Sequence, residues 1–237
     1  MQLDGSEIKR LRQYDLDHVI HPQFHRADHA GAVIYASGKG AVLTDIEGNE
    51  YIDGLSSLWN VAVGHGRAEL ADAAAAQMRT LAFSNAYTGY ANESSIRLTE
   101  KLLSLVYPNM SGVFYANSGS EANDFAMKAA RYFWFVSGQP RKTKIISRAE
   151  AYHGGTLAAT AITGMAPFHK GFGPEPPDFI QVPTCYPYRC QWCSDKPSCT
   201  LECADNIEAT IEREGADTVA AIIAEPVHGA GGVIPPD

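Results

Sequence analysis

The chain has 237 residues, a formal net charge of −8, 45% hydrophobic residues and 19% charged residues. This composition is typical of a globular protein with a real core. The acidic balance argues against nucleic acid as a partner. The sequence offers no apolar run long enough to span a bilayer, and residues 1–16 lack the apolar core of a signal peptide. We therefore expect a cytoplasmic protein that binds neither nucleic acid nor membrane.

The first part of the chain is predicted to contain a β-hairpin followed by two helices. The hairpin pairs residues 41–45 with residues 50–53 around a glycine-asparagine turn. The alanine-rich residues 67–81 form the first helix. Asn92 is a suitable N-cap for the second helix, which ends before Pro108. Its predicted apolar face consists of Ile96, Thr99, Leu103 and Val106.

In the rest of the chain, short apolar runs alternate with runs of helix formers. The strands are predicted at 112–117, 144–147 and 219–224, the helices at 118–133 and around Ile207 and Ile211 up to Gly215, and an irregular excursion at 182–199. Buried strands that alternate with helices indicate a parallel α/β sheet. In such sheets the ligand lies at the carboxyl ends of the strands. Residues 117–120, Tyr152 and Glu225 all follow strands, and we expect them to meet in one crevice.

Residues 118–124 (SGSEAND) join a predicted strand to a helix. Ser118 and Glu121 have the spacing of a capping box, so the first amides of this helix are left unpaired. Unpaired amides and the positive end of the helix dipole attract an anion. Gly119 allows close approach of the backbone, and Ser120 adds a hydroxyl donor. Taken alone, the capping box favours an ordinary capped helix over an anion site.

Two further segments distinguish these alternatives. Together with residues 151–156 (AYHGGT) and 225–232 (EPVHGAGG), the SGSEAND segment resembles the class III pyridoxal-phosphate-dependent aminotransferases. Residues 58–66 (LWNVAVGHG) narrow the resemblance to the omega-amino acid:pyruvate branch, the omega-transaminases. The resemblance implies fold type I, with a mostly parallel sheet and helices on both faces. Residues 58–237 would then be the first part of the large, cofactor-binding domain. Residues 1–57, with the hairpin, would be part of the small domain.

The resemblance also implies pyridoxal 5'-phosphate as cofactor. The residues that match the family's cofactor contacts are Ser118, Gly119, Ser120, Tyr152, His153 and Glu225. In the family the serine-glycine-serine segment holds the phosphate, the tyrosine stacks on the pyridine ring, and the histidine and glutamate lie near the cofactor. Without the resemblance, the tyrosine-histidine-glycine segment would be a plain turn and Glu225 a strand-end acid in a helix cap.

The implied activity transfers an amino group from an omega-amine or omega-amino acid to pyruvate or a similar keto acid. Trp59 and Tyr87 resemble the aromatic residues that line the substrate pocket, although a core position is the alternative for Trp59. The exposed aromatic segment 83–90 fits the family's homodimer. Within the family, an aminomutase or a decarboxylase is a further alternative.

The family's Schiff-base lysine, and the aspartate that pairs with the pyridine nitrogen, are expected beyond Asp237. The lysines of this sequence match no family lysine motif. We therefore expect the N-terminal half of a longer enzyme, with no catalytic residue of its own and no activity by itself. The alternative from another class is a non-catalytic fragment, or an interaction protein that binds only the phosphate or the cofactor.

All five cysteines fall between residues 185 and 203. Cys190, Cys193, Cys199 and Cys203 have a spacing that allows a tetrahedral zinc site, although the central gap of five residues is far shorter than in zinc ribbons. Disulfides do not fit a cytosolic protein. We expect these cysteines to be free thiols without a metal.

Overall fold

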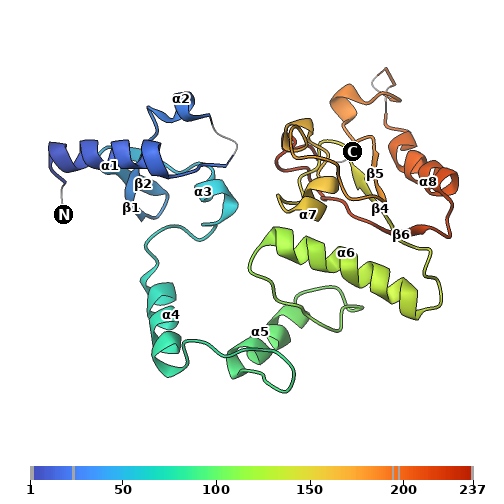
Figure 1. The fold of residues 1–237 in the computed structure, drawn as a ribbon, viewed down its shortest axis with the longest axis horizontal. Helices are drawn as coiled ribbons and strands as arrows, with labels where there is room; N and C mark the ends of the chain where they lie inside the picture. Colours follow the sequence, from blue (N-terminus) through green and yellow to red (C-terminus); the bar gives the residue numbers. More distant parts are fainter. Residues whose placement is uncertain (1–2, 23–24, 194, 197, 236–237) are drawn as a thin grey trace. The chain divides into compact units, whose positions relative to one another are not determined.

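The computed structural model describes residues 3–22, 25–193, 195–196 and 198–235. The chain divides into two compact units, residues 1–100 and 101–237. Each unit contains its own three-stranded sheet (Figure 1). The predicted domain boundary between residues 57 and 58 stays a prediction. None of the helices in the described part of the chain combines the length and the apolar character that crossing a membrane requires.

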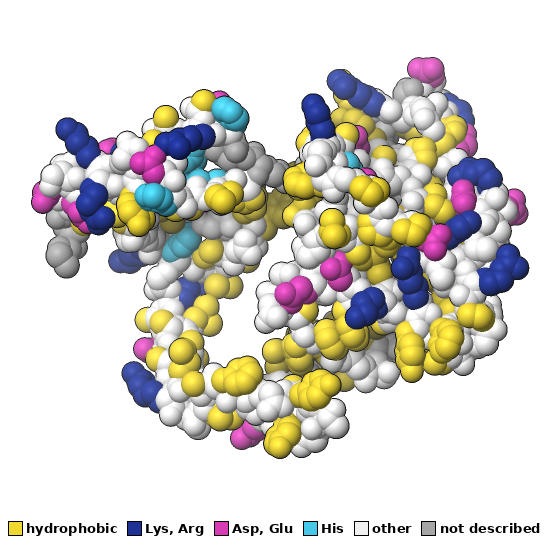
Figure 2. All heavy atoms as spheres, viewed as in Figure 1, with side chains coloured by type: hydrophobic (Ala, Val, Ile, Leu, Met, Phe, Trp, Pro, Cys, Tyr) yellow, Lys and Arg dark blue, Asp and Glu magenta, His cyan; other side chains and the backbone are white. Residues whose placement is uncertain are grey.

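The first unit begins with two polar helices, α1 (Gly5–His18) and α2 (Arg26–His29). Two further helices follow the sheet, α4 (Ala68–Thr80) and α5 (Glu93–Leu103), as predicted. The Asn92 side chain caps α5 by accepting the Ser95 N–H at 2.9 Å. No residue of α4 or α5 is buried, and apolar side chains gather on the exposed surface over both helices (Figure 2).

The sheet of the first unit is an antiparallel meander of β1 (Tyr35–Lys39), β2 (Val42–Asp45) and β3 (Glu50–Ile52). The predicted hairpin corresponds to β2 and β3, whereas β1 was not predicted. Asp45 holds the turn by accepting the N–H groups of Glu47 and Asn49 at 2.8 and 2.9 Å. Burial raises the pKa of this carboxylate, but hydrogen bonds from Asn49, Tyr51 and Glu47 outweigh burial and lower it to about 2.

The second unit is built on a parallel sheet in the order β5-β4-β6. The central strand β4 (Lys144–Arg148) pairs with β5 (Phe179–Val182) on one side and with β6 (Val219–Ile222) on the other. The parallel α/β class is therefore confirmed. Strands β4 and β6 were predicted, and β5 was not.

Helices cover both faces of this sheet, as the fold class implies. The helices are α6 (Gly119–Val136), α7 (Leu157–Ala161) and α8 (Glu202–Glu214), with 3₁₀ turns at Ala166–Phe168 and Pro187–Arg189. Successive side chains of β4 point to opposite faces. Ile145 packs with Met127 of α6. Ile146 lies in the second cluster, against which Ile207 and Ile211 of α8 pack.

The predicted buried strand at 112–117 is wrong. These residues are in neither sheet, and 60% of Phe114 is exposed. The Phe114 ring stacks on Phe125 of α6, with centroids 3.5 Å apart. An apolar run becomes a strand only where a neighbouring strand accepts its hydrogen bonds. In the described residues, the sheet of the second unit ends at β5 and β6.

Candidate functional site

The site is organised around the first turn of α6. Ser118 is the N-cap, and its hydroxyl oxygen accepts the Glu121 N–H at 3.2 Å. The Glu121 carboxylate accepts the backbone N–H of Asn117 at 2.9 Å and its side-chain amide at 3.0 Å. The return bond therefore falls one residue earlier than in a standard capping box. This arrangement fixes the chain where it enters the helix.

The same turn presents a set of hydrogen-bond donors. The hydrogen bonds of the described residues leave the N–H groups of Gly119 and Ser120 without an acceptor, as at most helix starts. A Cβ added to Gly119 would meet no atom within 4 Å, so the space beside it is open. The hydroxyls of Ser118 and Ser120 both accept backbone N–H groups, so their own hydrogens are free to donate. Two amides and two hydroxyls at a helix N-terminus suit a phosphate dianion.

The segment 152–155 lies directly against this turn. The Gly155 N–H donates to the Ser120 hydroxyl at 3.0 Å. Gly154 has a φ of +133°. A Cβ at Gly154 would overlap the Ser120 side chain and would come within 2.8 Å of the Ala159 Cβ. Glycine at this position therefore permits the close approach of the two segments.

Glu225, just beyond β6, ties together two loops that follow different strands. One carboxylate oxygen accepts the Tyr152 N–H at 2.9 Å, and the other accepts the Gly229 N–H at 3.0 Å. The Tyr152 ring is 39% exposed and lies 5.1 Å from the Phe168 ring, measured between centroids. A partly exposed tyrosine can stack on a second flat group. Residues 117–120 thus contact the segment that carries Tyr152, and Glu225 binds the same segment. Tyr152 and Glu225 follow strands as predicted, whereas residues 117–120 do not.

His153 is buried, and its backbone is held from two sides. Its N–H donates to the Thr163 hydroxyl at 3.0 Å, and its carbonyl accepts the Asn123 side-chain amide at 2.7 Å. Burial lowers the pKa of His153, and the neighbouring His228 lowers it further, whereas Glu225 raises it. The His153 ring is therefore neutral near pH 7.

His228 is fully buried beside the same carboxylate. Its Nδ1 lies 2.9 Å from the Thr184 hydroxyl. Burial lowers its pKa, and Glu225 opposes this shift. The Nε2 atoms of His153 and His228 are both buried without a hydrogen-bond partner among the described residues. The Glu225 carboxylate therefore interacts electrostatically with two histidines whose pKa values burial lowers.

Trp59 lies in a left-handed turn. The four residues of α3 (Ser56–Trp59) all have positive φ, between +49° and +66°. A left-handed turn costs non-glycine residues roughly 1–2 kcal/mol each. Asp53 stabilises it by accepting the Ser57 N–H at 2.8 Å and by contacting His65 Nε2 at 2.7 Å. Such strain is common at functional sites.

Trp59 and Tyr87 are 57% and 81% exposed within the first unit. The expected cofactor residues all belong to the second unit. The substrate-binding roles of Trp59 and Tyr87 therefore stay predictions.

The five cysteines line one small pocket of about 140 Å³ and are free thiols. The backbone N–H of Trp192 and the Cys193 thiol lower the pKa of Cys190. The contact with Cys190 and burial raise the pKa of Cys193 to about 12. In the part of the chain that the structure describes, no three of these sulfurs all lie within 4.8 Å of one another. The expectation that these cysteines bind no metal stays a prediction.

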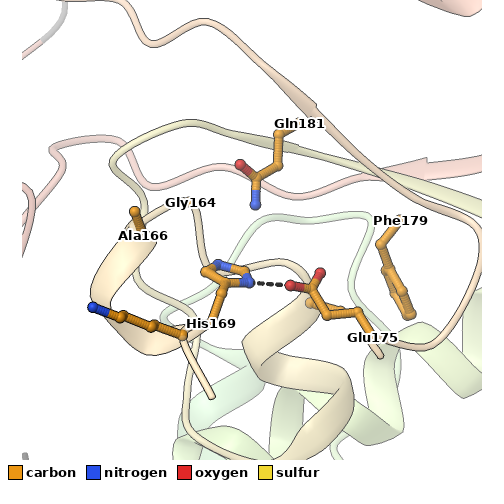
Figure 3. Close-up of a pocket in the computed structure, with 8 residues that line it drawn as sticks. Gly164, Ala166, His169, Glu175, Phe179 and Gln181 are labelled. Carbon is orange, nitrogen blue, oxygen red and sulfur yellow. Dashed lines mark hydrogen bonds and ion pairs between the residues drawn. The ribbon is translucent and has the colours of Figure 1, made fainter. Parts of the chain in front are cut away.

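A second, open pocket of about 530 Å³ is lined by Gly164, His169, Glu175 and Gln181, among others (Figure 3). His169 Nδ1 contacts the Glu175 carboxylate there, and His169 Nε2 lies 2.5 Å from the Thr163 carbonyl oxygen. Gln181 donates to the same carbonyl at 3.0 Å. Thr163 therefore connects this pocket to the segment that carries His153.

Three residues of this arrangement were missed at the sequence level. Asn123 and His228 lie inside the motifs singled out above, so their position in those motifs was an available signal. Thr163 had no such signal, because its partner His153 lies ten residues away and threonine is common at strand and helix ends.

Comparison with known proteins identifies the family. The family model for aminotransferase class-III matches residues 24–237, so the chain belongs to this family. It is 41% identical over 218 residues to a diaminobutyrate–2-oxoglutarate transaminase from Halomonas elongata, covering 90% of this chain and 46% of that protein. It is 34% identical over 239 residues to a putrescine–pyruvate aminotransferase from Pseudomonas aeruginosa, covering 100% and 52%. The chain spans about half the length of the curated relatives it matches.

Solved structures agree with this family. An (S)-enantioselective omega-transaminase from Thermomicrobium roseum has a TM-score of 0.91 at 39% identity, covering 100% of this chain and 52% of that chain. A PLP-bound amine transaminase from an uncultivated Pseudomonas species has a TM-score of 0.89 at 36% identity, covering 92% and 50%. The resemblance to class III aminotransferases is thus confirmed, and pyridoxal phosphate is the cofactor that the family and this neighbour imply.

Proposed function

We propose that the protein carrying this chain is a pyridoxal-phosphate-dependent transaminase. It would move an amino group from an omega-amine or omega-amino acid to pyruvate or a similar keto acid. The observation that carries the proposal is the convergence of three features: the donors at the start of α6, the half-exposed Tyr152 ring and the Glu225 carboxylate. This convergence occurs beyond the carboxyl ends of a parallel sheet, where ligands bind in this class of fold.

In this proposal each group has a defined task. The amides of Gly119 and Ser120, with the hydroxyls of Ser118 and Ser120, bind the phosphate. Tyr152 stacks on the pyridine ring, and Glu225 fixes the Tyr152 backbone. His153 is neutral, and its backbone hydrogen bonds to Thr163 and Asn123 hold the 152–155 segment in place. When bound, pyridoxal phosphate supplies the electron sink for the reaction, and the family's lysine is expected beyond residue 237.

The substrate pocket is proposed to include Trp59 and Tyr87. The two relatives above differ in the keto acid of their names, 2-oxoglutarate in one and pyruvate in the other. The resemblance of residues 58–66 to the omega-transaminases favours pyruvate as the keto acid.

The proposal also includes a cytoplasmic homodimer. Phe83, Tyr87 and Tyr90 are largely exposed and suit a subunit contact better than a solvated loop. Sedimentation that finds only monomer at micromolar concentration would reject the dimer.

The experiment supplies the full-length protein that carries this chain with pyridoxal phosphate, putrescine as amine donor, and either pyruvate or 2-oxoglutarate. We expect alanine to form with pyruvate, and faster than glutamate forms with 2-oxoglutarate. Faster formation of glutamate would move the protein to another branch of the family. If neither amino acid forms although the cofactor binds, the protein does not transfer the amino group of putrescine to either keto acid, and the proposed amine donor is wrong. The Tyr152→Ala variant is the control, because activity that stays unchanged in this variant does not depend on the proposed site.

A further inference from the structure

Three metal-ligating side chains meet in the first unit, outside the site described above. They are Asp15, His21 and His29, and one ligand atom of each lies within 4.8 Å of the other two. His21 Nε2 is 3.0 Å from Oδ1 of Asp15, and His29 Nε2 is 2.6 Å from Oδ2. The two imidazole rings lie side by side, with centroids 3.8 Å apart. Both rings therefore direct a nitrogen at the same carboxylate.

The three ligands come from different pieces of the chain. Asp15 lies in α1, His21 follows that helix, and His29 is the last residue of α2. Neither α1 nor α2 buries a residue. The contacts of Asp15 with both histidines therefore contribute to holding these pieces together. A metal ion at this point would cross-link all three pieces and stabilise a segment without a core.

We propose that Asp15, His21 and His29 bind one divalent transition-metal ion, and that zinc fits this ligand set best. Two imidazole nitrogens and one carboxylate oxygen are ordinary zinc ligands, and a site with three protein ligands keeps a fourth position open. Zinc bonds of about 2.0–2.2 Å place two tetrahedral ligand atoms roughly 3.3 Å apart. The present separations of 3.0 and 2.6 Å need to open by less than an ångström.

The surroundings leave room for the fourth ligand. An open pocket of about 410 Å³ is lined by His21 and His29, together with Asp17 and His18. Histidine side chains are visible over the N-terminal helices (Figure 2). A water molecule in this pocket can complete the coordination. Metal binding would replace the two imidazole–carboxylate contacts of Asp15 with metal–ligand bonds.

The test measures zinc binding to the untagged protein, because a polyhistidine tag binds the same metals. The protein is stripped of metal with a chelator and titrated with zinc in a calorimeter. We expect one equivalent of zinc that depends on Asp15. The Asp15→Asn and His29→Gln variants should weaken this binding at least tenfold, because loss of a ligand costs at least as much as loss of a supporting residue, about 10–100-fold. Zinc should also raise the melting temperature of the wild type but not of Asp15→Asn.

The matched control is His25→Asn, which removes a nearby histidine outside the set and keeps a side chain able to cap α2. This variant should bind zinc like the wild type. Unchanged zinc binding in Asp15→Asn and His29→Gln overturns the proposal. Loss of all zinc binding in Cys193→Ser also overturns it, because the metal would then belong to the cysteine pocket. The circular dichroism of each variant shows whether it is folded. This test is independent of transaminase activity.

Discussion

The hydroxyl of Thr163 accepts the backbone N–H of His153 at 3.0 Å, and both residues are buried. The same hydroxyl reaches the carbonyls of Ala159 at 3.0 Å and Gly154 at 3.2 Å. One side chain thus anchors the segment that carries Tyr152 to the end of α7. The position of the tyrosine ring depends on this anchor, although Thr163 itself is expected to touch neither cofactor nor substrate.

We expect Thr163→Val to destabilise the protein by about 1–3 kcal/mol, because it leaves the buried His153 N–H without an acceptor. Valine has nearly the shape of threonine, so the loss reports the hydroxyl and not a cavity. Thr163→Ser keeps the hydroxyl and should recover most of the stability. Urea unfolding of the three proteins measures the difference. Equal destabilisation by serine and valine would show that the methyl group, and not the hydrogen bond, matters.

The buried histidines predict a stability that depends on pH. Burial lowers the pKa of both His153 and His228 below the ordinary value of about 6.5. For each histidine, the unfolded chain therefore binds more protons than the folded protein at pH values between the lowered folded pKa and the unfolded pKa. Stability is complete above the unfolded pKa and is lost as the pH falls from about 6.5 towards the lowered folded pKa.

This loss is measured as the urea midpoint at pH 7.5 and at pH 5.5. His228→Gln removes one of the two groups, so its midpoint should fall less between these pH values than that of the wild type. An equal fall in both proteins would show that other groups cause the acid sensitivity.

The start of α6 could be predicted from the sequence because its contacts are local. Ser118 and Glu121 are three residues apart, and their hydrogen bonds depend only on the chain between Asn117 and Ala122. The alternation of apolar strands and helices likewise identified β4, β6 and the parallel class. Residues 112–117 have the same apolar pattern but are in neither sheet, because pairing depends on a distant neighbour that the pattern does not reveal.

The contacts that build the site are the least local ones. Glu225 meets Tyr152 across 73 positions of the chain, and Ser120 meets Gly155 across 35. The predicted strand ends and the family resemblance both predicted that these segments lie together, but neither specified the individual hydrogen bonds. Thr163 belongs to no motif, and only the structure reveals its contact with His153.

Ser120→Ala tests the proposed phosphate cradle. The variant loses a hydroxyl that can donate to the phosphate, a charge-assisted hydrogen bond worth roughly 1.5–3 kcal/mol. We expect the dissociation constant for pyridoxal phosphate to rise by about tenfold or more, measured by fluorescence after removal of the cofactor. Ser120→Thr keeps a hydroxyl and serves as the comparison. An unchanged cofactor affinity in the alanine variant would remove Ser120 from the cradle.

Alanine substitutions at two glycines of the site should affect stability and cofactor binding differently. Gly154 has a positive φ, and a Cβ there would overlap Ser120, so Gly154→Ala should push the 152–155 segment away from α6. We expect a clear fall in melting temperature, since strained backbone alone costs about 1–3 kcal/mol.

A Cβ at Gly119 meets only open space, so Gly119→Ala should melt like the wild type. The added methyl group would nevertheless occupy the space proposed for the phosphate, and cofactor affinity should fall. Gly119→Ala with full cofactor affinity would place the phosphate elsewhere, because a bound phosphate and this methyl group cannot share the open space beside α6.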